Sequence, residues 1–180
     1  MILAAILAAG KSTRFGVQKL TQNYHGKLLL QWPIDILKKI QVDRILVVSK
    51  KLNLSSIDLD NFKVVVNENA DMGLSTSVKL ALSMVRNHEG VLFLLGDMPK
   101  ISTDLVKKVI SMDRTKITFP FHDDVKGFPV YLPSRYFEEV TSLSGDVGLR
   151  MIIAKHPNEV ASFDGGKECI FDVDTPQDIS

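Results

Sequence analysis

The chain reads MILAAIL over residues 1–7 and AAGKSTRFGVQKL over residues 8–20, and this stretch indicates the type of domain to expect. The first part is an uncharged apolar run, long enough for a fully buried strand. The second part is a loop of small residues that carries Lys11, Arg14 and Lys19. Its glycines let backbone amides approach a ligand closely. Amide donors and cations at the end of a buried strand predict a phosphate-binding site.

Spacing excludes two better-known phosphate loops. Five residues separate Gly10 from Gly16, and Val17 follows, so the Gly-x4-Gly-Lys-Ser/Thr nucleotide loop is not matched. The dinucleotide fingerprint needs a further glycine that this stretch lacks. The alternative to a phosphate site is a glycine-containing turn with solvated cations.

Length and composition indicate one globular domain. The 180 residues are 45% hydrophobic and 24% charged, and their formal net charge of +1 gives no sign of nucleic-acid or membrane binding. The apolar start is too short to span a membrane and lacks a basic leader. The single Cys169, expected in a buried strand, excludes an internal disulfide and a cysteine-based zinc site. We therefore expect a cytoplasmic protein.

Apolar runs and amphipathic segments alternate along the chain. We expect strands at 1–7, 44–49, 62–66, 90–95, 116–120 and 159–163, and helices at 26–40, around 78–85, at 103–112, at 134–140 and from within 144–150. The run 90–95 predicts the central strand. An irregular hairpin at 121–133 interrupts the alternation. The sequence thus predicts a three-layer α/β/α domain with a mostly parallel sheet and one antiparallel strand.

Acidic residues occur where a metal-bound triphosphate would need them. No Asp or Glu precedes Asp35, whereas the last part of the chain is acidic. Asp97 follows the central strand and should enter the same crevice as the first loop, where a carboxylate suits Mg²⁺. The alternative, a helix cap, is disfavoured because Ser102 or Thr103 already serves as cap. In a strand, Asp172 and Asp174 would share a face and repel each other without a cation.

Two other segments attract a functional interpretation. Gly73 precedes three hydroxyl residues at a predicted helix start, which suits a nucleotide or an acidic substrate, although plain capping by Ser75 explains it equally well. The run His122-Asp123-Asp124 is better explained as a polar turn than as a metal site, since no second ligand set has suitable spacing.

Residues 7–20 match the signature L-A-A-G-x-S-x-R-[MF]-G-x-x-K-L, about ten positions of fixed spacing. In this stretch the chain resembles the molybdenum cofactor cytidylyltransferases, which are MobA-like NTP transferases of the Rossmann-like nucleotide-diphospho-sugar transferase superfamily. The resemblance continues at Gly-Asp-Met-Pro (96–99), at 73–78, at 145–150 and at 172–178. One departure is Phe128, which stands where the family has a histidine and cannot act as a titratable donor.

The resemblance implies Mg²⁺-dependent transfer of a nucleoside monophosphate, with release of pyrophosphate. Ala9 points to CTP because its methyl group narrows the site against a purine, and the implied acceptor is molybdopterin. Arg14, Lys19 and Asp97 would be catalytic. The implied nucleotide-binding residues are Leu7, Ala8, Ala9, Gly10, Lys11, Ser12, Arg14, Lys19, Gly73, Ser75 and Ser77; the metal ligands are Asp97, Asp172 and Asp174; the acceptor-binding residues are Gly127, Phe128, Pro129, Asp146 and Arg150.

Within the single domain 1–180, residues 1–112 would bind the nucleotide, and residues 113–180 would bind the acceptor and complete the metal site. A molybdoenzyme or a cofactor-insertion chaperone is an expected partner. Two alternatives stay open: a sugar- or alcohol-phosphate nucleotidyltransferase or guanylyltransferase of the same cofactor, and an inactive nucleotide-binding accessory module. Pyrophosphate release with any acceptor would exclude the module.

Overall fold

The computed structural model describes residues 1–10, 18–140, 142, 144–145 and 148–179. The strands are β1 (Ile2–Ala8), β2 (Asn23–Tyr24), β3 (Lys27–Leu28), β4 (Asp43–Val48), β5 (Lys63–Val66), β6 (Gly90–Leu95), β7 (Ile117–His122), β8 (Val125–Lys126), β9 (Val130–Pro133) and β10 (Val160–Asp164). The helices are α1 (Gln31–Lys38), α2 (Leu74–Ser83), α3 (Thr103–Ser111), α4 (Phe137–Val140) and α5 (Arg150–Lys155). Short 3₁₀ turns occur at Lys19–Thr21, Ala70–Met72, Ser134–Tyr136, Pro157–Glu159, Lys167–Cys169 and Pro176–Ile179.

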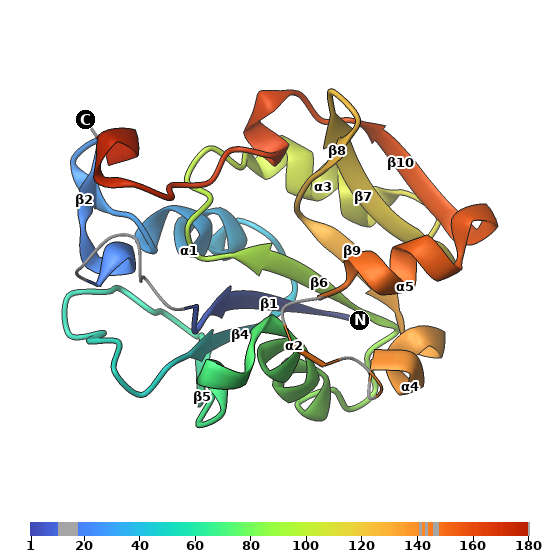
Figure 1. Cartoon of the computed structure of the whole chain (residues 1–180), viewed down its shortest axis with the longest axis horizontal. Helices are drawn as coiled ribbons and strands as arrows, with labels where there is room; N and C mark the ends of the chain where they lie inside the picture. The colour runs from blue at the N-terminus through green and yellow to red at the C-terminus, as the bar shows by residue number, and fades with distance from the viewer. Residues whose placement is uncertain (11–17, 141, 143, 146–147, 180) are drawn as a thin grey trace.

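An 8-stranded sheet crosses the molecule in the order β10-β7-β9-β6-β1-β4-β5, with β8 paired to β7 (Figure 1). Strands β6, β1, β4 and β5 are parallel neighbours, and β10 is parallel to β7. Strand β9 is antiparallel to both β6 and β7, while the short β8 closes a hairpin on β7. The central place of β6 and the mostly parallel sheet with an antiparallel insertion confirm the predictions.

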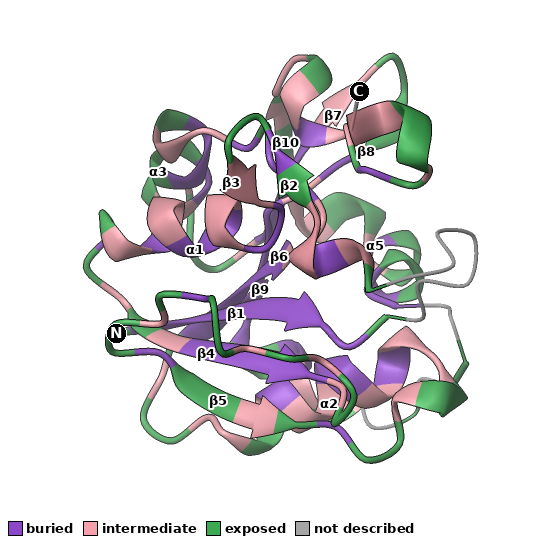
Figure 2. Cartoon of the chain, turned by 90° about the vertical axis from the view of Figure 1, so that its left-hand side faces the viewer, coloured by how far each residue is buried: buried purple, intermediate pink, exposed green. Residues whose placement is uncertain are grey.

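Helices cover both faces of the sheet, and every residue of β1 is therefore buried (Figure 2). Alternate side chains of β1 point to opposite faces. Ile2, Ala4 and Ile6 belong to the core that includes residues of α1 and α3. Leu3 and Ala5 belong to the core that includes residues of α2, α4 and α5. The uncharged start of the chain therefore specifies the middle layer of a three-layer domain.

Three local predictions are wrong. The helix expected from residue 26 starts only at Gln31, because β2 and β3 form a hairpin that turns at His25 and Gly26, both with positive φ. Cys169 is buried in a 3₁₀ turn rather than in a strand. The segment around Asp172 is also no strand, and the amide of Val173 donates to the main-chain oxygen of Asp97 at 3.0 Å instead.

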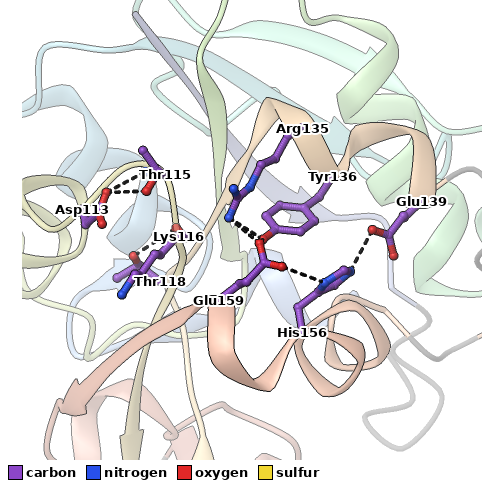
Figure 3. A network of polar contacts seen from close by, with 9 residues as sticks. All are labelled: Asp113, Thr115, Lys116, Thr118, Arg135, Tyr136, Glu139, His156 and Glu159. Carbon is purple, nitrogen blue, oxygen red and sulfur yellow. Dashed lines mark hydrogen bonds and ion pairs between the residues drawn. The ribbon is translucent and has the colours of Figure 1, made fainter.

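A polar network holds α4 to the end of α5 (Figure 3). The hydroxyl of Tyr136 donates to Glu159 Oε2 at 2.5 Å, and Arg135 Nη2 lies 2.6 Å from the same oxygen. His156 Nε2 lies 2.8 Å from Glu139 Oε1. The network fixes the region that precedes β10, on the far side of the sheet from α1 and α3. No helix among the described residues has the length and apolar character needed to cross a membrane.

Candidate active site

The loops predicted to carry the chemistry meet at one edge of the sheet. Parallel strands place their carboxyl ends at the same edge, and the amide of Gly96 after β6 donates to the main-chain oxygen of Leu7 in β1 at 3.0 Å. Because β9 is antiparallel, its first residue Val130 lies at this edge too, paired with Phe93. The loops after β1 and β6 and the loop before β9 are therefore neighbours.

The first loop begins in the core and leaves it abruptly. Leu7, Ala8 and Ala9 are buried, whereas Gly10 is exposed, and a methyl group added there would meet no atom of the described residues within 4 Å. As far as the described residues go, a ligand could approach the backbone here. The predicted nucleotide-binding residues Lys11, Ser12 and Arg14 lie outside the described residues.

Lys19 links the first loop to two predicted metal ligands. Its Nζ atom lies 2.8 Å from Asp97 Oδ2 and 3.7 Å from Asp174 Oδ1. The Lys19 side chain is only 12% exposed, and that of Asp97 is 22% exposed. Partial burial strengthens this ion pair relative to one on the open surface. One partly buried ammonium thus joins residues that are more than 70 positions apart in the sequence.

Asp172 adds further negative charge beside this pair. The pKa of Asp172 is raised, first because the surrounding protein reduces its hydration and then because the Asp97 and Asp174 carboxylates lie nearby. Part of the Asp172 residue remains exposed to solvent. The nearby carboxylates of Asp97 and Asp174 are therefore the cause that says most about the site. Asp172 therefore lies near the charges of both Asp97 and Asp174, although not on a strand.

These three carboxylates suit a divalent cation by their chemistry. Within the described ranges, no group of three or more His, Cys, Asp or Glu side chains is arranged to hold a metal ion. A ready-made cage is not required for Mg²⁺, which usually binds one or two carboxylates together with substrate phosphates and waters. Hard oxygen donors that repel one another, partly balanced by Lys19, fit such a shared site.

The predicted nucleotide-binding residues Gly73, Ser75 and Ser77 lie at the start of α2, but Ser75 does not cap this helix. Gly73 is the N-cap residue, with φ +104°, a conformation that favours glycine, so capping by Ser75 is wrong because Ser75 lies inside the helix. Ser75 and Ser77 are buried at 2% and 4% exposure. The amide of Ser75 donates to the main-chain oxygen of Gly145 at 3.2 Å. The segment around Gly145 therefore contacts the start of α2.

Asn67 is a buried residue that the sequence reasoning missed. Its Nδ2 atom donates to Thr76 Oγ1 and to Ser77 Oγ, each at 2.9 Å, and its Oδ1 accepts from the amide of Asn69 at 2.9 Å. Because Asn67 follows β5 directly, it fixes the start of α2 to the sheet edge. The only sequence signal is a polar residue immediately after an apolar strand.

Three of the predicted acceptor residues, Gly127, Phe128 and Pro129, directly precede β9 and so lie at the same edge. Phe128 is half-buried and packs against both cores, and its peptide bond to Pro129 is cis. The amide of Phe128 donates to the main-chain oxygen of Cys169 at 2.8 Å. Arg150 is exposed at the first position of α5, and Asp146 lies outside the described residues. His122, Asp123 and Asp124 form the β7–β8 turn, as predicted, with positive φ at both acids.

A family model for the MobA-like NTP transferase domain matches residues 4–160. The chain belongs to the MobA-like NTP transferase family. As a MobA-like NTP transferase it is a nucleotidyltransferase, and its loops at the carboxyl edge of the sheet are the parts that the sequence motifs identified.

Two curated relatives of this MobA-like protein differ in the base their names imply. The molybdenum cofactor cytidylyltransferase of Escherichia coli is 25% identical over 178 residues, which cover 97% of this chain and 91% of that protein. A probable molybdenum cofactor guanylyltransferase of Pyrococcus horikoshii is 33% identical over 110 residues, which cover 61% of this chain and 55% of that protein.

Solved structures of similar proteins share the whole fold. The crystal structure of Rv0371c from Mycobacterium tuberculosis superposes with a TM-score of 0.86 at 28% identity, covering 99% of this chain and 95% of that one. A manganese complex of the same mycobacterial protein matches with a TM-score of 0.71 at 23% identity, covering 99% and 92%. This MobA-like protein and the mycobacterial protein therefore share one fold over nearly all of the two chains compared.

Proposed function

We propose that this MobA-like protein transfers CMP from CTP to molybdopterin with the help of Mg²⁺. The observation that carries the proposal is the meeting of Lys19, Asp97 and Asp174 at the carboxyl edge of the sheet. Similarity to the cytidylyltransferase of Escherichia coli over 97% of the chain supports both the base and the acceptor. The Leu-Ala-Ala-Gly start, which resembles the cytidylyl branch of the family and in which Ala9 would narrow the site, also supports CTP.

In the proposed reaction, an oxygen of the acceptor phosphate attacks the α-phosphorus of CTP. A new phosphorus–oxygen bond forms while the bond to the β-phosphate oxygen breaks, and pyrophosphate leaves. Such a transfer depends mainly on positioning and charge neutralisation. Mg²⁺ held by Asp97 with Asp172 and Asp174 would neutralise charge on the phosphate oxygens. Lys19 and Arg14 would bind the β- and γ-phosphates, so Lys19 would exchange its carboxylate partners for phosphate oxygens.

The proposed division of labour follows the chain. Residues 1–112 bind the nucleotide through the first loop and the start of α2, while residues 113–180 bind the acceptor and complete the metal site. The contact between Asp174 and Lys19 supports the second role. Gly127, Phe128, Pro129, Asp146 and Arg150 form the proposed acceptor side, where the Phe128 ring can stack on a planar ligand.

A guanylyltransferase of the same cofactor is the second candidate. The observation in its favour is the 33% identity with the Pyrococcus horikoshii protein, which exceeds the identity with the cytidylyltransferase but extends over only 61% of the chain. The two candidates share the metal site and differ in the base. A sugar- or alcohol-phosphate acceptor is the remaining variant of the same chemistry.

Thermal unfolding with Mg²⁺ and each of CTP, GTP, UTP and ATP tests the proposal. A ligand at a hundred times its dissociation constant raises the midpoint by about 5–10 °C for a chain of this size. We expect this shift with CTP and Mg²⁺ together, and its loss in Asp97→Asn. A shift with GTP alone would favour the guanylyltransferase. Pyrophosphate release from CTP with molybdopterin, and not with sugar phosphates, would then establish the acceptor.

A further inference from the structure

The segment 167–174, which we name the C-terminal strap, carries two of the predicted metal ligands without belonging to a strand. A strand would fix Asp172 and Asp174 through its ladder of main-chain hydrogen bonds. In the strap, the direction of these carboxylates depends on individual contacts instead. Cys169 and Val173 are fully buried and flank Asp172, so they hold the strap to the core. They do not by themselves fix the orientation of the exposed Asp172 between them or of Asp174 after them.

Two side-chain contacts hold the strap to the segment that follows Asp97. The hydroxyl of Ser102 donates to Glu168 Oε1 at 2.8 Å. The Nζ atom of Lys100 lies 3.7 Å from the centre of the Phe171 ring, within the range of a cation–π interaction. Phe171 is the residue immediately before Asp172. These contacts and the Val173–Asp97 main-chain bond connect the strap to residues 97–102 at successive points along its length.

The other side of the strap contacts the proposed acceptor segment. The main-chain oxygen of Cys169 accepts from the amide of Phe128 at 2.8 Å. A methyl group added to Gly127 would lie only 2.3 Å from that same Cys169 oxygen, so the two segments are in direct backbone contact. One strap therefore touches both the loop that carries Asp97 and the loop that carries Phe128.

We infer that Lys100 and Glu168 are positioning residues, which dock the C-terminal strap so that Asp172 and Asp174 face Asp97. This inference rests on the proposed metal-dependent function. Neither residue is required to touch substrate or metal. Their effect is on the geometry of carboxylates that do, in the way that outer-sphere residues orient metal ligands. Loss of either contact should weaken metal binding more than it changes turnover at saturating metal.

The experiment measures metal binding by thermal shift and activity by pyrophosphate release. For each variant, MgCl₂ is titrated at fixed CTP, and the concentration that gives half of the thermal shift is recorded. Lys100→Met and Glu168→Ala should raise this concentration about tenfold. Glu168→Gln keeps an oxygen that can accept from Ser102 and should restore most of the wild-type value. At saturating MgCl₂, the turnover of all three variants should stay within about twofold of wild type, because none of the proposed catalytic residues is changed.

The chain offers a matched control for the cation–π contact. Lys108 Nζ lies 4.1 Å from the centre of the Phe163 ring on β10, and Lys108 is exposed, as is Lys100. Lys108→Met removes the same kind of contact from outside the strap and should leave metal half-saturation unchanged.

The outcomes separate this inference from the proposed function. If wild type shows no Mg²⁺-dependent shift with any nucleotide, the proposed metal site is wrong and the inference falls with it. If wild type shifts but Lys100→Met and Glu168→Ala match it, Cys169 and Val173 suffice to place the strap, and the inference alone is overturned. Equal weakening by Lys108→Met would likewise contradict it, because the effect would then be a general loss of stability.

Discussion

The ammonium of Lys19 lies 2.8 Å from the Asp97 carboxylate, and this contact joins the loop after β1 to the loop after β6. Both partners are mostly buried, and Asp174 approaches the same ammonium at 3.7 Å. The Lys19 ammonium thus lies where the proposed reaction would bind both the metal ion and the phosphates of the nucleotide. Removal of the Lys19 charge should therefore impair the proposed reaction.

Lys19→Met should lower turnover at least about a hundredfold, as the removal of one electrostatic stabiliser does in other enzymes. The measurement is steady-state pyrophosphate release. Lys27→Met is the control, because Lys27 forms an ion pair with Asp35 at 2.5 Å and is not among the predicted site residues. A Lys19→Met enzyme with near-normal turnover would remove this lysine from the mechanism.

Asn67→Ala should destabilise the protein by about 1–3 kcal/mol, because it removes a buried donor that two hydroxyls accept from. Urea unfolding measures the change. We also expect a higher KM for the nucleotide, since α2 loses its attachment to the end of β5. Asn53→Ala serves as the comparison, because Asn53 is exposed and its side chain accepts a local hydrogen bond from the amide of Ser55, and it should leave both quantities near wild type. Unchanged KM in a destabilised Asn67→Ala would limit this residue to a structural role.

Asp172→Asn should stabilise the protein at pH 7 while it impairs Mg²⁺ binding. The raised pKa of Asp172 means that its ionised form is disfavoured in the folded state, so stability is lost as pH rises through that pKa. Removing the charge should raise the melting midpoint by about 1–3 °C, as expected for partly exposed like charges. The gain should vanish below the ordinary aspartate pKa of about 3.9, where the Asp172 side chain of the wild type is also neutral. A variant that is less stable at pH 7 would contradict the repulsion.

Tyr136→Phe should weaken the acid sensitivity of the fold. The hydroxyl of Tyr136 is the main reason why the pKa of Glu159 is lowered, with Arg135 and His156 contributing further (Figure 3). A lowered carboxyl pKa gives stability that is present above the unfolded-state value of about 4.3 and is lost as pH falls through the folded-state value. Denaturant unfolding at pH 7 and pH 4 should therefore show a smaller difference in the variant. The same difference in both proteins would exclude this hydrogen bond as its source.

Long apolar runs and strand-end motifs made much of the site predictable. The run 90–95 predicted the central strand, and the carboxyl-edge rule then placed Asp97 beside the first loop. The antiparallel direction of one strand also followed from the irregular hairpin before it. These features depend on hydrophobic periodicity and on general properties of parallel sheets, which a single sequence carries.

The remaining features depend on contacts between distant residues. Ser102 and Glu168 are 66 positions apart, and no local pattern marks them as partners. Asn67 is one polar residue after a strand, which is too common to stand out. The early helix boundary was misplaced because apolar spacing continues through Lys27–Leu30, where tertiary pairing of β2 with β3 overrides helical propensity. The shared strand face expected for Asp172 and Asp174 was wrong, because residues 171–174 form no strand, and their role as metal ligands stays a prediction.

The reversed direction of β9 has an evolutionary consequence. An antiparallel strand needs no crossover helix, so the loop before it can change in length and composition without altering the parallel ladder from β6 to β5. If this loop binds the acceptor, as proposed, acceptor preference would be free to diversify on this scaffold without a change in the nucleotide-binding strands. Grafting the loop that carries Phe128 between relatives would then exchange their acceptors.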